Sequence, residues 1–579
     1  MKHIAPISGV ASFQDMYVAS AGYDNQVILW DARSHQALAK VNHDHLANMC
    51  VFSPVGDLLA SASSDYTARI WDVPSMRLRA VLSGHTDDVE MVAFSPDGKR
   101  VATCSRDHSI RIFDIDGNHL ATCLGHTADV ISVAWMPSGT EIVSSSDDGS
   151  VRQWTAGDGS QLSVSNFDGI ETDTVAITPE GLIFAGDDEG RISILRGETA
   201  ISSVTAHEAG IKRLVYSPVS RQLVSLSYDR KMKIWQVNAE AIVKLAEAAL
   251  PNIIWPRSCS FVGKEKIAFA TFGSTYAVYN IRNGTWDDID YEASKSVNAV
   301  LPVGDALYTV GDAGIVRKDN AFVADMNGLC NFFTRFGSTL VTGGQMGSIH
   351  NAMTGEVVYQ HHSPLNCGCA FLRDDIPHAA IGTYTGEVVI IREIDGKVEV
   401  VTSIKMHENA IKGVATDGEV IFAVSANRNA AVASIGSFSV IETWIGKHRQ
   451  IANGCAVVAP GVFCSVSRDL TLRIWRRSEI EEIKTPHRNS SKCVAANETY
   501  IATGDYGGRI AVYNLETNTW LNVVRPSTSG ISSISTDVRT SSFVASCYDG
   551  RVYGVTICDE TVSVSVRLDV PYNQLMAAE

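Results

Sequence analysis

A unit of about forty residues recurs along the chain and constrains its fold more than any other feature. Five segments align without gaps, and in each of them an Asp stands six residues before a terminal aromatic residue. The segments are SAGYDNQVILWD (20–31), SASSDYTARIWD (61–72), CSRDHSIRIFD (104–114), SSSDDGSVRQW (144–154) and SLSYDRKMKIW (225–235). Following the terminal position down the chain gives fourteen units, with spacings of 34 to 44 residues. The sequence therefore predicts a repeat architecture.

Within each unit the hydrophobic period is two rather than 3.6. The segment 89–105, VEMVAFSPDGKRVATCS, has apolar runs split by a Pro-Asp-Gly turn, which is typical of short antiparallel strands. The segment 238–250, NAEAIVKLAEAAL, is rich in helix formers, but the repeat needs a fourth strand there. We therefore predict an all-β protein, with a strand rather than a helix at 238–250.

A histidine also recurs upstream of the Asp in the early units, and an aromatic residue follows it after nine positions. The pairs are His43 and Phe52, His85 and Phe94, His126 and Trp135, and His207 and Tyr216. Buried polar groups need hydrogen-bond partners. His, Ser, Asp and Trp at fixed offsets therefore predict a buried network in each unit.

These residues resemble the WD-repeat family of β-propellers, with the family marks Gly84-His85, Gly125-His126, Trp30-Asp31 and Trp71-Asp72. The resemblance implies that the His, the Ser of the second strand, the turn Asp and the Trp bond to one another inside each blade. It assigns this structural network to His43, Ser63, Asp65, Trp71, His85, Asp107, His126, Asp148, Trp154, His207, Asp229 and Trp235, with Asp469 and Trp475 as remnants in the second half.

Fourteen units exceed the four to eight blades of a usual ring, so we predict two tandem seven-bladed WD-repeat β-propellers. Residues 1–292 would form the first, with strong signatures, and residues 293–579 the second, with degenerate ones. Unit five has Asp168 and Glu189 at the His and Asp positions. Because the signature fades after unit seven, we expect the second propeller to be held mainly by apolar packing. Ring closure stays open: a different split or a strand exchanged between rings are the alternatives.

The charge balance excludes some classes of partner. The chain has 48 Lys+Arg and 64 Asp+Glu, a net charge of -16, which disfavours nucleic acid and anionic lipid surfaces. No apolar stretch reaches the length of a membrane span, and the start lacks a secretory segment. We predict a soluble cytoplasmic protein without membrane insertion, whose 12 cysteines are free thiols.

No sharp enzyme signature occurs: the GxxxxGK[ST], GxSxG and HExxH motifs are all absent. His361, His362, Cys367 and Cys369 are residue types that zinc prefers, but their spacing is poor and favours buried thiols beside a solvated His pair. Residues 114–118 loosely resemble a calcium loop, although a hairpin turn explains them better. The His and Asp pairs recur in many units, whereas a catalytic group is needed once. We predict no catalytic residues, no cofactor and no metal site.

The family resemblance also implies a binding face. Residues three and five positions after the recurring His, and the one before the turn Asp, would face the top of the ring around its channel. The resulting candidate partner-binding residues are Tyr23, Asp88, Glu90, Arg106, Asp129, Asp147, Glu171, Asp173 and Tyr228. Residues 1–292 carry a net charge of -12 and residues 293–579 one of -4. We expect exposed carboxylates that dock a basic partner; a solvated acidic rim is the alternative.

In the second propeller the equivalent positions hold Arg428, Arg468, Tyr506 and Tyr548, which predicts a face of opposite character. These features together predict a non-enzymatic scaffold that docks other proteins on propeller faces. Two alternatives stay open. The length and layout resemble the actin-interacting protein 1 family, which implies binding to actin filaments together with cofilin. The other is an enzyme, or a sensor of a small ligand or metal, with its site in a propeller channel. The partners and the oligomeric state are not determined by the sequence.

Overall fold

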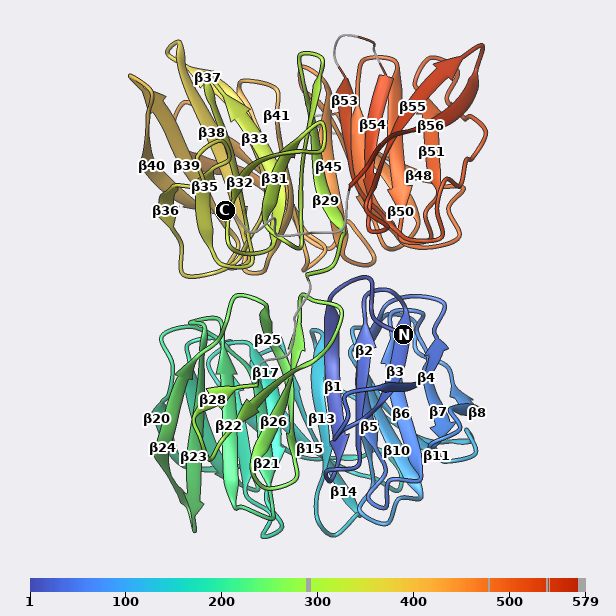
Figure 1. The fold of residues 1–579 in the computed structure, drawn as a ribbon, viewed down its shortest axis with the longest axis vertical. Coiled ribbons are helices and arrows are strands. Elements are labelled where there is room, and N and C mark those ends of the chain that lie inside the picture. The colour runs from blue at the N-terminus through green and yellow to red at the C-terminus, as the bar shows by residue number, and fades with distance from the viewer. Residues whose placement is uncertain (288–292, 477–478, 538–539, 541, 571–579) are drawn as a thin grey trace. The chain divides into compact units, whose positions relative to one another are not determined.

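The computed structural model describes residues 1–287, 293–476, 479–537, 540 and 542–570. The chain divides into two compact units, Met1–Glu292 and Ala293–Glu579, and Figure 1 shows the strands of each. All regular secondary structure in these residues is β, as the period of two predicts. Over the same ranges there is no helix that could cross a membrane.

Each unit is built from seven four-stranded antiparallel sheets, and each sheet consists of four strands consecutive in the sequence. We number these blades 1 to 14 in chain order. Blade 4 is representative: β13 (Val130–Trp135), β14 (Glu141–Ser146), β15 (Ser150–Thr155) and β16 (Gln161–Asn166) follow one another. The prediction of two tandem seven-bladed propellers is therefore confirmed.

The first strand of every blade contacts the first strands of the two neighbouring blades, which makes these strands the innermost layer of each ring. In the first unit they are β1 (Ile7–Phe13), β5 (Ala47–Phe52), β9 (Val89–Phe94), β13, β17 (Thr172–Ile177), β21 (Ile211–Ser217) and β25 (Ile254–Val262). In the second they are β29 (Val297–Val303), β33 (Cys330–Phe336), β37 (Leu365–Arg373), β41 (Ile411–Thr416), β45 (Ala452–Ala459), β49 (Ser491–Ala496) and β53 (Ile531–Asp537).

Apolar side chains fill the space between adjacent blades. One cluster joins Leu58 and Ile70 of blade 2 to Val92, Val101 and Phe113 of blade 3. The second strand of a blade is covered on both faces, as β14 is along nearly its whole length, whereas the fourth strand, such as β16, is largely exposed. A single blade cannot cover both of its faces, so each blade depends on its neighbours for its core.

Each ring closes through its first and last innermost strands, without an exchanged strand in the described residues. In the first unit, Val10 N donates to Ser258 Oγ at 3.0 Å, and the Ser12 and Ser260 hydroxyl oxygens lie 2.8 Å apart. Figure 1 shows β1, in blue, beside the green β25. In the second unit, Ser535 Oγ donates to Val300 O at 2.6 Å. The alternative of a strand shared between rings is therefore not realised there.

The segment 238–250 forms β24 (Ala241–Ala249), a strand that pairs with β23 (Lys231–Asn238) in blade 6. The strand prediction is confirmed against the local helix propensity. A fourth strand gains a ladder of hydrogen bonds to β23, which outweighs a propensity difference of a few tenths of a kcal/mol per residue.

Candidate functional site

A buried polar network links two strands, the turn between them and the entry loop of blade 4. His126, four residues before β13, contacts Asp148 through Nδ1 and Ser144 through Nε2, each at 2.8 Å. The Trp154 indole N–H donates to the same Ser144 hydroxyl at 2.9 Å. Asp148 also accepts the backbone N–H of Thr127 at 3.0 Å. This arrangement connects the loop, the second strand, the turn and the third strand of one blade.

The same geometry recurs in other blades of the first propeller. The Nδ1 atoms of the histidines lie 2.8 to 3.0 Å from the turn carboxylates, and the Trp indoles donate to a Ser of the second strand at 2.8 to 2.9 Å. These contacts involve His43 with Asp65, His85 with Asp107, His207 with Asp229, Trp71 with Ser61, and Trp235 with Ser225. In blade 3, Phe113 replaces the Trp, and the Thr103 hydroxyl oxygen lies 2.8 Å from His85 Nε2.

The assignment of Ser63 to this network is wrong, because Ser61 takes that place. Ser61 Oγ lies 2.7 Å from His43 Nε2 and accepts the Trp71 indole N–H. Leu59 lies directly opposite Trp71 in the ladder, so Ser61 is the diagonal neighbour of the indole, while Ser63 is two residues farther along the strand. Ser63 Oγ instead accepts the backbone N–H of Asp65 at 3.0 Å.

Sequence reasoning also missed the network of blade 1. His3 contacts Asp24 at 2.9 Å and Ser20 at 2.8 Å, and Trp30 donates to Ser20 at 2.7 Å. The spacing from His3 to Asp24 is 21 residues, against 22 in the other blades. That one-residue offset hides His3 from a search at fixed spacing. The sequence does contain a signal for His3. Asp24 and Trp30 have the usual spacing of the network, so a His is expected about 22 residues before Asp24.

The second propeller retains more of this network than its sequence suggests. In blade 12, Trp475 donates to Ser465 at 2.8 Å, and Ser465 Oγ lies 3.2 Å from His448 Nε2. Arg473, which is 1% exposed, lies between the His and the carboxylate, with Nη2 3.2 Å from Asp469 Oδ2. In this blade a buried ion pair replaces the direct contact between His and Asp.

Acid should destabilise the first propeller through these networks. Burial lowers the pKa of His126, so below about pH 6.5 the unfolded chain binds protons that the folded one does not. Burial raises the pKa of Asp148, but His126, the Ser150 hydroxyl and the Thr127 N–H together outweigh it and hold that pKa below its usual value. Stability is therefore lost a second time below about pH 4. Asp147 and Asp173, whose pKa values are raised in the folded protein, oppose this loss. In a variant with both of them changed to Asn, we expect urea midpoints to fall steadily from pH 7.5 to pH 4. A midpoint constant over that range in this variant would contradict this account.

A second constellation, which we call the inner rim, lies at the ends of the innermost strands in the first propeller. The backbone N–H of Arg106 donates to the carbonyl oxygen of Asp88, and that of Asp147 to the carbonyl oxygen of Asp129, each at 3.0 Å. In both pairs the donor precedes the turn Asp, and the acceptor lies three residues after the recurring His. The inner rim comprises Asp88, Glu90, Arg106, Asp129, Asp147, Glu171, Asp173, Asp188, Lys212 and Arg257. These backbone hydrogen bonds hold neighbouring candidate binding residues side by side at the ends of the innermost strands.

Three cations compensate part of the negative charge of the inner rim. Arg106 contacts Glu90 and Asp129, each at 2.5 Å. Arg257 contacts Glu90 at 2.9 Å, and Lys212 pairs with Asp173 and Asp188. The combined field of Arg106 and Arg257 holds the pKa of Glu90 below its usual value, although burial alone would raise it.

The expectation that all of these carboxylates are exposed is wrong. Asp88, Glu90 and Asp129 are 1%, 7% and 9% exposed, because the innermost strands converge and side chains at their ends cover one another. Asp147, Glu171 and Asp173 are half-buried and retain surface. Asp188 is also half-buried, so these four carboxylates are the ones in the inner rim that a partner could contact.

The negative charge at Asp147 is not balanced by its surroundings. Burial raises the pKa of this carboxyl well above its usual value, and the charges of Glu171, Asp129 and Asp173 raise it further, while Arg106 opposes them. Burial likewise raises the pKa of Asp173 to about 6, against the opposing field of Lys212. An additional cation at this place would relieve the repulsion.

The aromatic candidates flank the inner rim. Tyr23 meets Trp255 edge to face, with ring centroids 5.2 Å apart, and the Lys212 ammonium lies 4.9 Å from the centre of the Tyr228 ring. Sequence reasoning missed Trp255 and Arg257. Blade 7 has no His to count from, and the ladder of β25 is interrupted between Ile254 and Cys259, so fixed offsets fail there.

The equivalent positions of the second propeller carry cations and aromatic rings. The Arg468 guanidinium lies 5.8 Å, and the Lys492 ammonium 6.0 Å, from the centre of the Tyr506 ring. Lys412 stands over Tyr384 at 4.5 Å. Burial raises the pKa of Tyr506, but the fields of Lys492, Arg468 and Lys412 outweigh it and lower the pKa. This face therefore has the cationic character that the sequence predicts.

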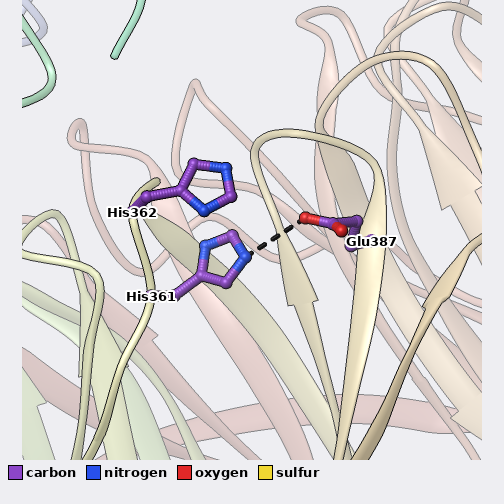
Figure 2. Close-up of side chains that lie close together, drawn as sticks. All are labelled: His361, His362 and Glu387. Carbon is purple, nitrogen blue, oxygen red and sulfur yellow. Dashed lines mark hydrogen bonds and ion pairs between the residues drawn. The ribbon is translucent and has the colours of Figure 1, made fainter. Parts of the chain in front are cut away.

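Near blade 10 the structure gathers His361, His362 and Glu387, as Figure 2 shows. One ligand atom from each residue lies within 4.8 Å of the others, and His361 Nε2 is 3.2 Å from Glu387 Oε2. The sequence grouped this His pair with Cys367 and Cys369 instead. Both thiols lie on β37, where burial raises the pKa of Cys367 to about 12, so at neutral pH they are protonated and poor metal ligands.

Fourteen blades in two rings, together with the His, Ser, Asp and Trp network, define a double β-propeller protein. The family model described as "WD domain, G-beta repeat" matches residues 38–72, 76–114, 117–155 and 198–236, all in the first propeller. These four segments of the first propeller are therefore similar to WD repeats.

Several curated fungal proteins are similar over short segments. The nuclear distribution protein PAC1 of Gibberella zeae is 36% identical over 76 residues, which cover 12% of this chain and 16% of the relative. The nuclear distribution protein nudF of Aspergillus niger is 32% identical over 77 residues, covering 12% of this chain and 17% of the relative. Protein HIR1 of Cryptococcus neoformans is 32% identical over 83 residues, 14% of this chain and 9% of the relative. The chain thus matches less than a fifth of the length of each of these relatives.

Proposed function

We propose that this protein is a non-enzymatic scaffold in which the inner rim of the first propeller docks a basic segment of a partner protein. The observation that carries the proposal is the charge balance of the rim: seven carboxyl groups converge there with three cations, Arg106, Lys212 and Arg257. A rigid frame of blades suits this role, because it loses little conformational entropy when a partner binds. WD repeats in the relatives support protein interaction in general.

A basic side chain of the partner would gain most binding free energy next to Asp147 and Glu171. Their mutual repulsion raises the pKa of Asp147, and an Arg or Lys beside them would lower that pKa and favour the ionised form. Tyr23 and Tyr228 flank the rim as half-buried aromatic side chains of the kind that interfaces favour. The docked segment would therefore combine cationic residues with an apolar or aromatic contact.

The test is the affinity of a fluorescent Arg-rich peptide for wild type and for the double variant Asp147→Asn, Glu171→Gln at moderate salt. Both substitutions keep the shape of the side chain and remove one carboxylate each. We expect the double variant to bind at least about tenfold more weakly, because two charged contacts are lost. Affinity capture from the native cell with both proteins would then show whether native partners follow the same pattern.

A matched control removes two carboxylates elsewhere on the first propeller, through Glu198→Gln and Glu265→Gln, both exposed. This control should bind the peptide within about twofold of wild type, since long-range charge effects are screened. Wild-type binding should also strengthen from pH 5 to pH 7, because Asp173, with a pKa of about 6, becomes ionised. Equal weakening in the control and the rim variant would show that net charge acts rather than the rim.

A cytoplasmic location and the absence of catalysis are parts of this proposal. The actin-binding role implied by the resemblance to the actin-interacting protein 1 family stays a prediction, as do an enzyme or sensor site in a channel. The inner rim could be confused with a catalytic carboxylate site, because Asp147 and Asp173 have raised pKa values. The ion pair of Asp173 with Lys212 favours docking over proton transfer at that carboxylate.

A further inference from the structure

Blade 10 departs in one coordinated way from the network that blades 1, 2, 3, 4 and 6 share. In blade 4, Ser144 stands two residues before the end of β14, and Asp148 stands two residues after it. In blade 10, β38 (Ile376–Thr383) places Ile381 and Thr385 at those positions. His361 has therefore lost both of the usual partners of the propeller histidine.

Glu387, the first residue of β39 (Glu387–Ile394), supplies a replacement of different chemistry. Its Oε2 accepts the Thr385 hydroxyl at 3.0 Å and lies 3.2 Å from His361 Nε2. His362 adds a second imidazole, with ring centroids 4.1 Å apart. The position directly after the His holds Asp44, Thr86, Thr127 and Glu208 in blades 2, 3, 4 and 6. A second His at that position is thus a feature of blade 10 that those blades do not share.

From these contacts we propose that His361, His362 and Glu387 form a binding site for a divalent transition metal ion, with zinc as the best-fitting ion. Two imidazoles and one carboxylate are a ligand set that zinc accepts when a fourth position is left open. Tetrahedral zinc with bonds of about 2.0 to 2.1 Å separates neighbouring ligand atoms by about 3.3 Å. The observed 3.2 Å between His361 Nε2 and Glu387 Oε2 matches one edge of such a tetrahedron.

The surroundings of His361 allow its Nε2 atom to exchange the hydrogen bond with Glu387 for a bond to a metal ion. Its Nδ1 lies 3.1 Å from the Ser363 N–H and 3.3 Å from the Ser363 carbonyl oxygen, so Ser363 can pair with either tautomer. When the single imidazole proton stands on Nδ1 and points to that carbonyl, the lone pair of Nε2 is available to the metal. The ring stays neutral, and no net proton is released from His361.

Exposure also favours a site that a metal ion can enter. His361 is buried, Glu387 is half-buried and His362 is exposed, so the open coordination position would be reached from the side of His362. Figure 2 shows the Glu387 carboxylate facing the His361 ring, with the His362 ring next to that of His361. Water, or a ligand from another molecule, would complete the coordination there.

The test measures zinc binding to the full chain by equilibrium dialysis of the metal-free protein against Zn²⁺ alone, in wild type and in two single variants. Glu387→Gln keeps an acceptor for the His361 hydrogen bond, and His362→Asn changes an exposed residue, so both variants should fold. Wild type should bind about one equivalent in the micromolar range or tighter, and each variant should bind about 100-fold more weakly or not at all. His119→Asn removes an exposed His elsewhere and should bind like wild type.

A second readout uses Co²⁺ in place of Zn²⁺. Wild type should show the intense visible absorption of a four-coordinate cobalt site, and the two variants should lose it while their circular dichroism stays that of the folded protein. The proposal is overturned if metal-free wild type binds no Zn²⁺. It is equally overturned if Glu387→Gln and His362→Asn bind Zn²⁺ as tightly as wild type does.

Discussion

Replacement of His126 by Ala should lower the free energy of unfolding of the first propeller by about 3 kcal/mol. The substitution removes a charge-assisted contact to Asp148 and a contact to Ser144, each 2.8 Å long. It also leaves a cavity beside the buried Trp154 ring, whose centroid is 5.8 Å from that of His126. Lost hydrogen bonds to charged groups and truncated buried side chains each cost a few kcal/mol. Urea unfolding followed by Trp fluorescence would measure the change.

The matched control is His119→Ala. His119 lies on the exposed β12 (His119–Leu124) of the neighbouring blade and contacts Thr122. We expect its substitution to change the unfolding free energy by less than about 0.5 kcal/mol. If His126→Ala costs no more than this control, the network does not stabilise the blade, and the recurring His has some other role.

The second large effect should follow the removal of Arg473 in blade 12. Arg473 Nη2 lies 2.7 Å from Glu482 and 3.2 Å from Asp469, and Nη1 lies 2.7 Å from His448 Nδ1. Arg473→Met keeps the apolar stem but leaves the buried Asp469 carboxylate without its cation. Breaking a buried ion pair on one side costs about 3 to 5 kcal/mol, so we expect a loss of that size in the second propeller.

The double variant Arg473→Met, Asp469→Asn separates pairing from packing. Because the uncompensated charge is gone, it should be more stable than Arg473→Met alone by at least about 1 kcal/mol. Burial lowers the pKa of His448 to about 3, and the field of Arg473 adds to this effect, so Arg473→Met should also raise that pKa, as followed by NMR of the imidazole. A double variant less stable than Arg473→Met would refute the ion-pair account.

The apolar packing shared between neighbouring blades explains why these effects should be large. Each blade shares its apolar faces with two neighbours, as Leu58 and Val92 do across blades 2 and 3. A disturbed blade therefore cannot relax without moving the adjoining ones, since close-packed interiors transmit strain. Denaturation of the two units need not coincide, so the transition of each should be analysed separately.

Much of the fold was predictable from local patterns. The hydrophobic period of two predicted where strands form, and the spacing of Asp and Trp predicted the number of blades. Both predictions were possible because each blade repeats the same local pattern at nearly constant length. The same regularity placed His126, Asp148 and Trp154 in contact. Where the length varies, as between His3 and Asp24 or along β25, the positions were missed.

The burial of the inner rim and the grouping of His361 with Glu387 were decided by tertiary structure. Counting along the chain assigns Asp88 and Glu90 to the ring face, but convergence of the innermost strands buries them against Arg106 and Arg257. The carboxylate beside His361 comes from a strand 26 residues farther on, in a blade where the usual partners are replaced. The sequence by itself thus determined the repeat, the strands and the blade network, because these depend on residues at fixed short spacings. The burial of charge and the pairing within an altered blade depend on how strands meet in space, and the spacing of residues along the chain does not contain that information.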